Sequence, residues 1–188
     1  MTLRFATPDD APALLNIYRQ SIPTTVTFEY ELPSREEFVR RITTMSAVYP
    51  YLILEEDGQV LGYAYSHQIG ERAAYRFGAE LSIYLDHCCK GRGLGKRLYQ
   101  VLNRMLRLQG VRTENGLVAS PNPASEALHR ALGFHVMGIQ AKAGYKNGQW
   151  IDLIWYEMVL LPYDEYPAPI IPIHHLPTHE IQTILNHF

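Results

Sequence analysis

The feature that most constrains the fold is a glycine-rich, basic segment that lies between a strand pattern and a helix pattern. Residues 79–85, AELSIYL, have the composition of a strand and run directly toward residues 90–98, KGRGLGKRL. Apolar side chains then recur at steps of three and four, the spacing of one buried helix face; they are Leu94, Leu98, Leu102, Met105 and Leu106. The chain therefore contains a strand, a flexible cationic turn and a helix in succession.

A turn of this kind is suited to holding a phosphate group. Its glycines let the backbone approach an anion closely, and the start of the helix contributes about half a positive charge. Lys90, Arg92, Lys96 and Arg97 make the local field positive, although the formal net charge of the chain is -2. The glycine spacing matches neither of the two common phosphate-loop motifs. A flexible loop with solvated basic side chains is therefore the alternative for this segment taken alone.

The rest of the chain predicts a sheet with helices packed against it. Further strands are expected at residues 3–6, on both sides of Asp57-Gly58, at 117–119, at 135–139 and at 150–160. Further helices are expected after Thr7, after Ser34 and from Asn122 to Gly133. The resulting order, β-α-α-β-β-β-α-β-α-β-β, predicts an α/β (α+β) protein with a mixed central sheet of about seven strands and about four flanking helices.

The C-terminal segment departs from this pattern. It contains Pro162, Pro167, Pro169, Pro172 and Pro177, so it cannot pair regularly in a sheet. We expect one domain over residues 1–161, followed by a proline-rich strap over residues 162–188. Thr178 is expected to cap a short terminal helix that docks on the domain or on a second subunit through one apolar stripe; the stripe comprises Ile181, Ile184, Leu185 and Phe188.

Composition narrows the possible functions. Hydrophobic residues make up 47% and charged residues 19% of the 188 residues, which is ordinary globular usage. The basic cluster is local and has no interleaved aromatic residues, which disfavours nucleic-acid binding. The only cysteines, Cys88 and Cys89, are adjacent, which favours a reduced, cytoplasmic protein. No metal is expected, because the spacing of the tail histidines fits no standard site; these are His174, His175, His179 and His187.

Two separated motifs resemble those of the GCN5-related N-acetyltransferase (GNAT) family. K-G-R-G-L-G, residues 90–95, looks like the family's [RQ]-x-x-G-x-[GA] motif, with Lys90 in place of the usual arginine or glutamine. NPASEALHRALGF, residues 122–134, resembles the family's N-x-x-(A/S)-x-x-L-(Y/H)-x-x-x-G-F segment. The similarity extends over residues 3–160 in element order and implies the GNAT fold.

Four further blocks resemble the phosphinothricin and methionine sulfoximine acetyltransferase branch of that family. They are TTVTFE (24–29), YPYL (49–52), RAAYRFGAELSIY (72–84) and GYKNGQWIDL (144–153). The resemblance implies an acetyl-CoA-dependent enzyme that acetylates the amine of a small amino-acid-like substrate bearing a carboxylate, and it implies a homodimer. Acetylation of a protein, peptide or polyamine is an alternative, as is an acyl-CoA-binding module without turnover.

The resemblance also implies where acetyl-CoA binds. The backbone of the strand before the glycine turn would pair with the pantetheine arm, the turn would hold the pyrophosphate, and the start of the later helix would contact the cofactor beyond it. The implied residues are Ile83, Tyr84, Leu85, Lys90, Gly91, Arg92, Gly93, Leu94, Gly95, Lys96, Asn122 and Ser125. For Asn122, a helix cap alone is the alternative.

Acetyl transfer to an amine needs a base for the amine and a proton for the departing thiolate. Glu80 is the implied base, acting directly or through water, and a solvated glutamate at a strand edge is the alternative. His129 stands where much of the family has a tyrosine, so it is either the acid or a residue that shapes the pocket. Arg72 and Tyr75 are implied to bind the substrate carboxylate, and Phe28 and Glu29 are implied to border its side chain.

Overall fold

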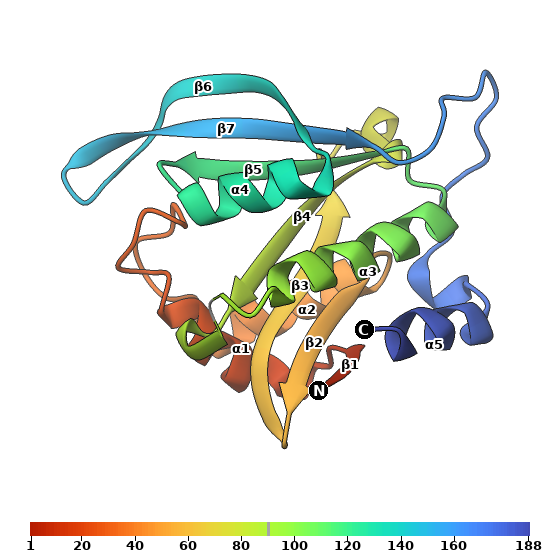
Figure 1. The fold of residues 1–188 in the computed structure, drawn as a ribbon, viewed down its shortest axis with the longest axis horizontal. Helices are drawn as coiled ribbons and strands as arrows, with labels where there is room; N and C mark the ends of the chain where they lie inside the picture. The colour runs from red at the N-terminus through yellow and green to blue at the C-terminus, as the bar shows by residue number, and fades with distance from the viewer. Residues whose placement is uncertain (90) are drawn as a thin grey trace.

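The computed structural model describes residues 1–89 and 91–188, and its elements follow the predicted order (Figure 1). The strands are β1 (Thr2–Phe5), β2 (Tyr51–Glu56), β3 (Gln59–Gln68), β4 (Gly78–Leu85), β5 (Thr113–Ser120), β6 (His135–Lys146) and β7 (Gln149–Val159). The α-helices are α1 (Ala11–Arg19), α2 (Arg35–Ser46), α3 (Leu94–Gln109), α4 (Pro123–Leu132) and α5 (Thr178–Asn186). Among these described residues, no helix is both long and apolar enough to cross a bilayer.

The strands form one mixed sheet, as predicted from the alternation of strands and helices, and their order in it is β1-β2-β3-β4-β5-β7-β6. Neighbouring strands are antiparallel except for β4 and β5, which are parallel. This parallel pair is short, because only Gly78, Ala79 and Glu80 of β4 pair with β5. Beyond Glu80 the two strands diverge (Figure 1), and the sheet is forked from that residue onward.

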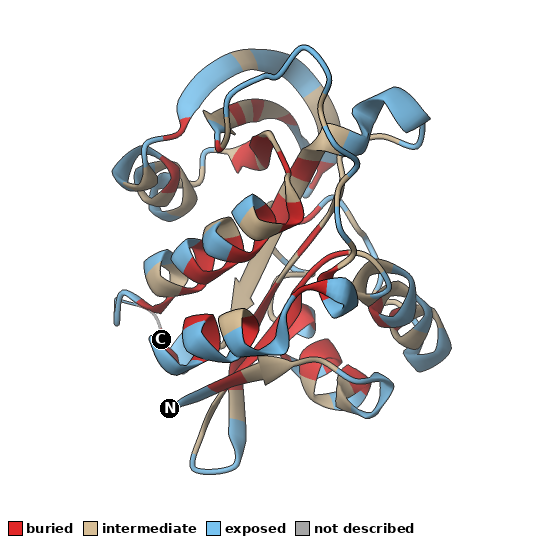
Figure 2. Ribbon diagram, turned by 90° about the vertical axis from the view of Figure 1, so that its right-hand side faces the viewer, coloured by how far each residue is buried: buried red, intermediate tan, exposed pale blue. Residues whose placement is uncertain are grey.

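The two faces of the sheet have separate cores. Along β2, Tyr51 and Ile53 pack in the cluster under α1 and α2, whereas Leu52 and Leu54 pack in the larger cluster under α3 and α5. This alternation is the two-residue period of a strand that is buried on both faces. Figure 2 shows the same arrangement, with the buried residues of the helices turned toward the sheet and the exposed ones turned outward.

The sequence signals for helix and turn boundaries are mostly confirmed. The Ser34 hydroxyl accepts a hydrogen bond from the Glu37 backbone N–H at 3.1 Å, as expected of a helix cap. Gly110 ends α3 with a φ of 86°, a left-handed conformation that favours glycine. The Asp57-Gly58 hairpin is also present, with both residues at positive φ.

Three expectations differ from the structure. β5 begins at Thr113 and spans eight residues, whereas only a brief strand at 117–119 was expected. β6 extends to Lys146 rather than ending near residue 139, and it forms a long hairpin with β7 through Asn147-Gly148, which both have positive φ. Thr178 is the first residue of α5 rather than its cap; Pro177 occupies the cap position and makes no side-chain cap hydrogen bond. The strap before α5 is irregular apart from a 3₁₀ turn at Ile173–His175, and α5 packs against α3 and β1.

Candidate active site

The fork between β4 and β5 opens a cleft. Its wider part has a volume of about 350 Å³ and its inner part about 70 Å³. Residues 81–85 of β4 have no strand partner on the β5 side, so their backbone N–H and C=O groups on that side are available to a ligand. The cleft is lined by β4, β5, α3, α4 and the segment after α1; its residues include Ile83, Tyr84, Leu85, Gly95, Asn122, Ser125 and His129.

The glycine turn lies at the outer end of this cleft. Gly91 and Gly93 have φ values of 78° and 72°, and Gly93 occupies the cap position before α3. Side chains other than glycine rarely adopt this conformation, and the free N–H groups at the start of a helix bind phosphate well. The turn and the unpaired edge of β4 therefore fit the diphosphate and the extended arm of coenzyme A.

The placement of the turn's basic side chains fits an anion less clearly than the placement of its backbone does. The Arg92 guanidinium pairs with the carboxylate of Glu56 in the β2–β3 hairpin at 3.0 Å. Lys96 is exposed, and Lys90 lies outside the described residues. Backbone groups are thus the part of the turn whose placement fits an anion most clearly.

Asn122 and Ser125 lie where the cleft meets α4. The side-chain oxygen of Asn122 accepts a hydrogen bond from the Ser125 backbone N–H at 3.2 Å, so Asn122 caps this helix. Both residues also line the cleft. Capping is therefore observed, and cofactor contact by either residue stays a prediction.

Glu80 lies in a second cavity, on the opposite side of β4. This cavity has a volume of about 220 Å³ and lies under α1 and α2. The Glu80 side chain is 21% exposed, and its carboxylate lies 3.8 Å from the imidazole Nε2 of His67 on the paired strand β3. Burial raises the pKa of Glu80 above its usual value, and the nearby His67 partly opposes this effect. A raised pKa suits a group that takes up a proton near neutral pH.

Tyrosines and one ion pair form the rest of this cavity. Stacked or edge-on rings line it, including a Tyr51–Tyr65 stack with centroids 4.8 Å apart. Glu29 reaches the cavity from the segment after α1, and its carboxylate lies 2.7 Å from the guanidinium of Arg41 on α2. The cavity therefore holds a carboxyl group on β4 and an ion pair beneath α2.

The cavity and the cleft meet at β4. Ser82 and Tyr84 line both the cavity and the inner cleft, and they are the next residues after Glu80 on the same face of the strand. A group bound in the cleft and a group bound in the cavity would therefore approach each other across this strand. The fork begins immediately after Glu80, so this carboxyl group, the predicted base, lies at its apex.

His129 lies at the inner end of the cleft and is 2% exposed. Its Nδ1 donates to the backbone oxygen of Ser125 at 2.8 Å, and burial lowers its pKa. Its Nε2 has no partner among the described residues, and the ring fills the space that a side chain at Gly116 would occupy. The imidazole is thus neutral, with its free lone pair on Nε2. This arrangement favours a shaping role, because Nε2 has no proton to give.

Three predicted substrate residues lie outside the cavity of Glu80. Arg72 and Tyr75 belong to an exposed 3₁₀ turn before β4, and Tyr75 is 53% exposed. Phe28 packs against Gly144 of β6 and is 37% exposed. Of the four residues expected to bind substrate, only Glu29 lines this cavity. Substrate contact by the other three stays a prediction.

Three residues near the site, His67, Arg41 and Glu114, were not found from the sequence, and a fourth, Lys146, was expected only to contact either substrate or a dimer partner. His67 faces Glu80 only because of the β3–β4 register, and Arg41 reaches the cavity from a helix that also carries exposed arginines. Lys146 is 2% exposed and donates to backbone oxygens in the segment that carries Glu29. Glu114 of β5 is fully buried, and neither carboxylate oxygen has a partner among the described residues. For Glu114, the only available signal in the sequence was the unusual position of a glutamate inside a strand.

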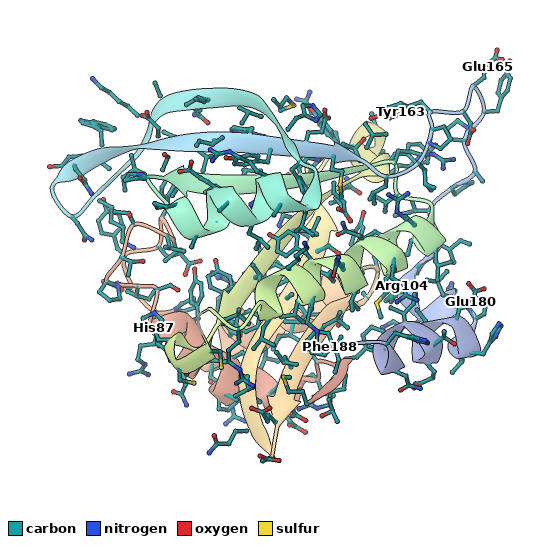
Figure 3. The ribbon with its side chains drawn as sticks, in the orientation of Figure 1. His87, Arg104, Tyr163, Glu165, Glu180 and Phe188 are labelled. Atoms are coloured by element: carbon teal, nitrogen blue, oxygen red, sulfur yellow. The ribbon has the colours of Figure 1, made fainter. Side chains whose placement is uncertain are left out.

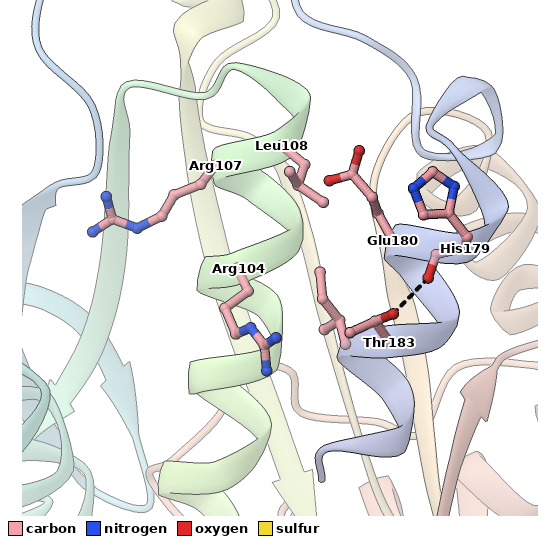
Figure 4. Close-up of a pocket in the computed structure, with 7 residues that line it drawn as sticks. Arg104, Arg107, Leu108, His179, Glu180 and Thr183 are labelled. Atoms are coloured by element: carbon pink, nitrogen blue, oxygen red, sulfur yellow. Dashed lines mark hydrogen bonds between the residues drawn. The ribbon is translucent and has the colours of Figure 1, made fainter.

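Another hollow lies between α3 and α5, away from this chemistry. Its volume is about 350 Å³, and Figure 4 shows Arg104 and Leu108 of α3 facing Glu180 and Thr183 of α5. In Figure 3, Glu180 lies on the opposite side of the molecule from His87, which borders the cleft. None of its lining residues also lines the cleft or the cavity of Glu80, so it is not the site of the reaction.

Comparisons with known proteins agree with this geometry. The model of the acetyltransferase (GNAT) domain family matches residues 3–155. Phosphinothricin N-acetyltransferase of Streptomyces viridochromogenes is 34% identical over 91% of this chain and 93% of its own length. L-methionine sulfoximine/L-methionine sulfone acetyltransferase of Pseudomonas aeruginosa is 32% identical over 88% of this chain and 98% of its own. The crystal structure of a Sinorhizobium meliloti phosphinothricin acetyltransferase in complex with AcCoA superposes with a TM-score of 0.84 at 36% identity, covering 92% of this chain and 97% of that one.

Proposed function

Because the chain belongs to the GNAT family of acetyl-CoA-dependent N-acetyltransferases, we propose that it acetylates the amine of a small amino acid such as phosphinothricin, methionine sulfoximine or methionine sulfone. The two curated relatives named above act on these compounds according to their names. The cavity of about 220 Å³ has the size of a small substrate, which supports a free amino acid over the tail of a protein.

The observation that carries this proposal is the position of Glu80 at the apex of the fork. The cleft takes the cofactor from one side of β4, and the cavity takes the amine from the other. An amine held beside Glu80 is then adjacent to Ser82 and Tyr84, the residues that both spaces share. Placing two reactants in one geometry removes much of the entropic barrier to their reaction.

The chemistry of the site follows from its groups. Acetyl-CoA supplies an acetyl thioester. Glu80, with its raised pKa, takes a proton from the ammonium form of the substrate, so that the free amine can form the new N–C bond while the C–S bond breaks. The unpaired backbone N–H groups of residues 81–85 are available to stabilise negative charge on the carbonyl oxygen. The nitrogen loses two protons in all: the first passes through Glu80 to solvent, and the second, lost as the C–S bond breaks, is the one that the departing thiolate takes up.

The roles of Arg72, Tyr75 and His129 are also part of this proposal. Arg72 and Tyr75 lie just before β4, and we assign them to the α-carboxylate of the bound substrate from outside the cavity. His129 is assigned to shaping the inner cleft. Its alternative, proton donation to the thiolate, requires that a proton first reach Nε2.

A thiol-release assay tests the function. Wild-type protein is mixed with acetyl-CoA and each of a panel of free amino acids and their oxidised or phosphono analogues. We expect thiol release with at least one carboxylate-bearing amine, and a loss of kcat of about a hundredfold or more in Glu80→Gln with little change in coenzyme A binding. Coenzyme A binding without release for any amine would instead support a non-catalytic acyl-CoA-binding module.

A homodimer through the β6–β7 hairpin is part of the proposal. β6 is an edge strand, and the hairpin exposes large apolar side chains; they are Val136, Met137, Ile139, Tyr145 and Trp150. An exposed apolar patch beside an unpaired strand edge is typical of an interface. Light scattering on the purified protein tests this, and Ile139→Glu should give monomers if the hairpin is the interface.

The compartment is proposed on the cysteines alone. Cys88 and Cys89 are both free thiols, with their sulfur atoms 3.4 Å apart. Free thiols in contact persist in a reducing compartment, which supports the cytoplasm.

A further inference from the structure

Arg41 is the one arginine among the residues that line the cavity of Glu80. Its guanidinium is held from two sides: Nε donates to Glu37 at 2.9 Å, and Nη1 donates to Glu29 at 2.7 Å. Within the described residues, Nη2 has no acceptor. The two hydrogen bonds fix the direction of the guanidinium. Because the side chain is still 32% exposed, its Nη2 group is available to donate to a ligand.

Arg41 and Glu80 line the same cavity but come from different elements of its wall. Tyr51, Tyr65 and Ser82 face one another across β2, β3 and β4. Adjacent strands lie about 4.8 Å apart, so β2 and β4 are separated by about 10 Å. The helix α2, which carries Arg41, packs on β2 and β3, whereas Glu80 is on β4. A substrate whose amine lies at Glu80 therefore extends its side chain under α2.

We propose that Arg41 binds the oxygen atoms at the end of the substrate side chain and so selects amino acids with a phosphinate, sulfone or sulfoximine group. This inference rests on the proposed function and adds its specificity residue. A guanidinium presents several donors in one plane, which suits groups that carry two acceptor oxygens on one atom. The glutamates bonded to Nε and Nη1 leave Nη2 of this cavity-lining residue as the donor for the substrate.

Glu29 gives the inference a second, independent consequence. Its carboxylate offsets the charge of Arg41, so it disfavours an anionic phosphinate more than a neutral sulfone. Removing this carboxylate should therefore improve phosphinothricin as a substrate. A purely structural ion pair predicts the reverse, because losing either partner would then damage the cavity for every substrate.

The test measures kcat/KM for phosphinothricin, methionine sulfone and methionine, whose thioether has no oxygen. In Arg41→Met we expect a loss of about tenfold to a hundredfold for the first two, the effect of a hydrogen bond to a charged group, and less than about threefold for methionine. Glu29→Gln should raise kcat/KM for phosphinothricin and change that for the sulfone less. Arg40→Met is the matched control, because Arg40 also pairs with Glu37 but is 74% exposed and does not line the cavity.

The outcomes separate the inference from the proposed function. No acetylation of the three compounds by wild-type protein contradicts the proposed substrate class. Acetylation by wild type, with an equal loss for all three compounds in Arg41→Met, overturns the role of Arg41, as does a fall in phosphinothricin activity in Glu29→Gln. Melting curves report whether Arg41→Met is folded. If it is not, Arg41→Lys, which keeps the charge but loses the planar donors, should show the same selective loss in smaller measure, and an unselective loss overturns the inference.

Discussion

The side-chain ammonium of Lys146 lies 2.7 Å from the backbone oxygen of Glu29 and also donates to the backbone oxygen of Thr27. Lys146 is on β6 and is 2% exposed, and burial lowers its pKa. One buried cation thus fastens the segment that carries Glu29 to the β6–β7 hairpin. Through Lys146, the β6–β7 hairpin therefore contacts the segment whose Glu29 lines the cavity of Glu80.

Lys146→Met should loosen this segment. Two charge-assisted hydrogen bonds disappear, and two backbone oxygens lose their buried partner, which destabilises the fold by about 1–3 kcal/mol. We expect KM for the amino acid to rise about tenfold and KM for acetyl-CoA to rise less, because Val26 of this segment borders the cleft but most of the cleft is formed by β4, α3 and α4. Steady-state kinetics with each substrate varied in turn measure this. Lys142→Met, on the same strand but exposed, is the control, and an equal rise in both KM values would contradict the prediction.

The acidic side of the pH profile should depend on His67. Activity requires ionised Glu80, so kcat/KM rises with pH through the pKa of that group. The charge of His67 lowers this pKa, in opposition to burial. His67→Gln removes the charge, so the pKa of Glu80 rises and the acidic limb moves to higher pH, with about tenfold less activity on the limb for each pH unit moved. A limb that stays in place or moves to lower pH would show that the two groups do not interact.

Stability should fall toward alkaline pH because of Glu114. Burial raises its pKa to about 9, well above the value of about 4.5 in the unfolded chain. The folded state therefore keeps a proton that the unfolded state has lost, and the free energy of unfolding decreases by about 1.4 kcal/mol per pH unit between these two values. Glu114→Gln should lack this slope.

Urea unfolding at pH 5 and at pH 8.5 measures the effect. The difference in unfolding free energy between Glu114→Gln and wild type should grow with pH in favour of the variant. Glu71→Gln, at an exposed position, should follow wild type at both pH values. Parallel slopes for Glu114→Gln and wild type would mean that Glu114 is ionised or solvated in the folded protein.

Gly116→Ala should disturb the inner cleft. A Cβ at this position would lie 2.1 Å from Nε2 of His129, too close for any relaxed contact. Overpacking of this kind costs about 1–3 kcal/mol, and the ring must move toward the cleft. We expect a lower melting temperature and weaker acetyl-CoA binding by calorimetry. Gly138→Ala is the control, because nothing lies within 4 Å of its added Cβ; similar losses in both variants would remove His129 from the explanation.

The parts of the fold set by local chemistry were predictable. Ser34, Gly110 and the Asp57-Gly58 turn act through their own backbone conformations and near neighbours, so their sequence signals were sufficient. The length of β6 was underestimated because Asn147-Gly148 was not recognised as a hairpin turn, although it has the same chemistry as Asp57-Gly58. A turn signal of this type deserves equal weight wherever it occurs between strand-forming residues.

The site was predictable only in part. Resemblance to a family located Glu80 and the glycine turn, because both belong to one strand-turn-helix unit that is continuous in the sequence. Arg41 and His67 meet Glu80 through packing of a helix and register of a hairpin, neither of which local spacing determines. Whether a long side chain such as that of Arg41 turns inward depends on partners distant in sequence, here Glu29.

The fork after Glu80 separates two kinds of recognition. Along residues 81–85, one side of β4 offers main-chain groups that are the same for every amino acid, whereas the cavity under α1 and α2 is built of individual side chains. Substitutions in the cavity can therefore change which acyl acceptor is bound. The proposed binding of the acyl donor uses main-chain groups of β4, which such substitutions leave in place. A new acceptor preference would therefore need changes only among the side chains that line this cavity, on two helices, three strands and the segment that carries Glu29.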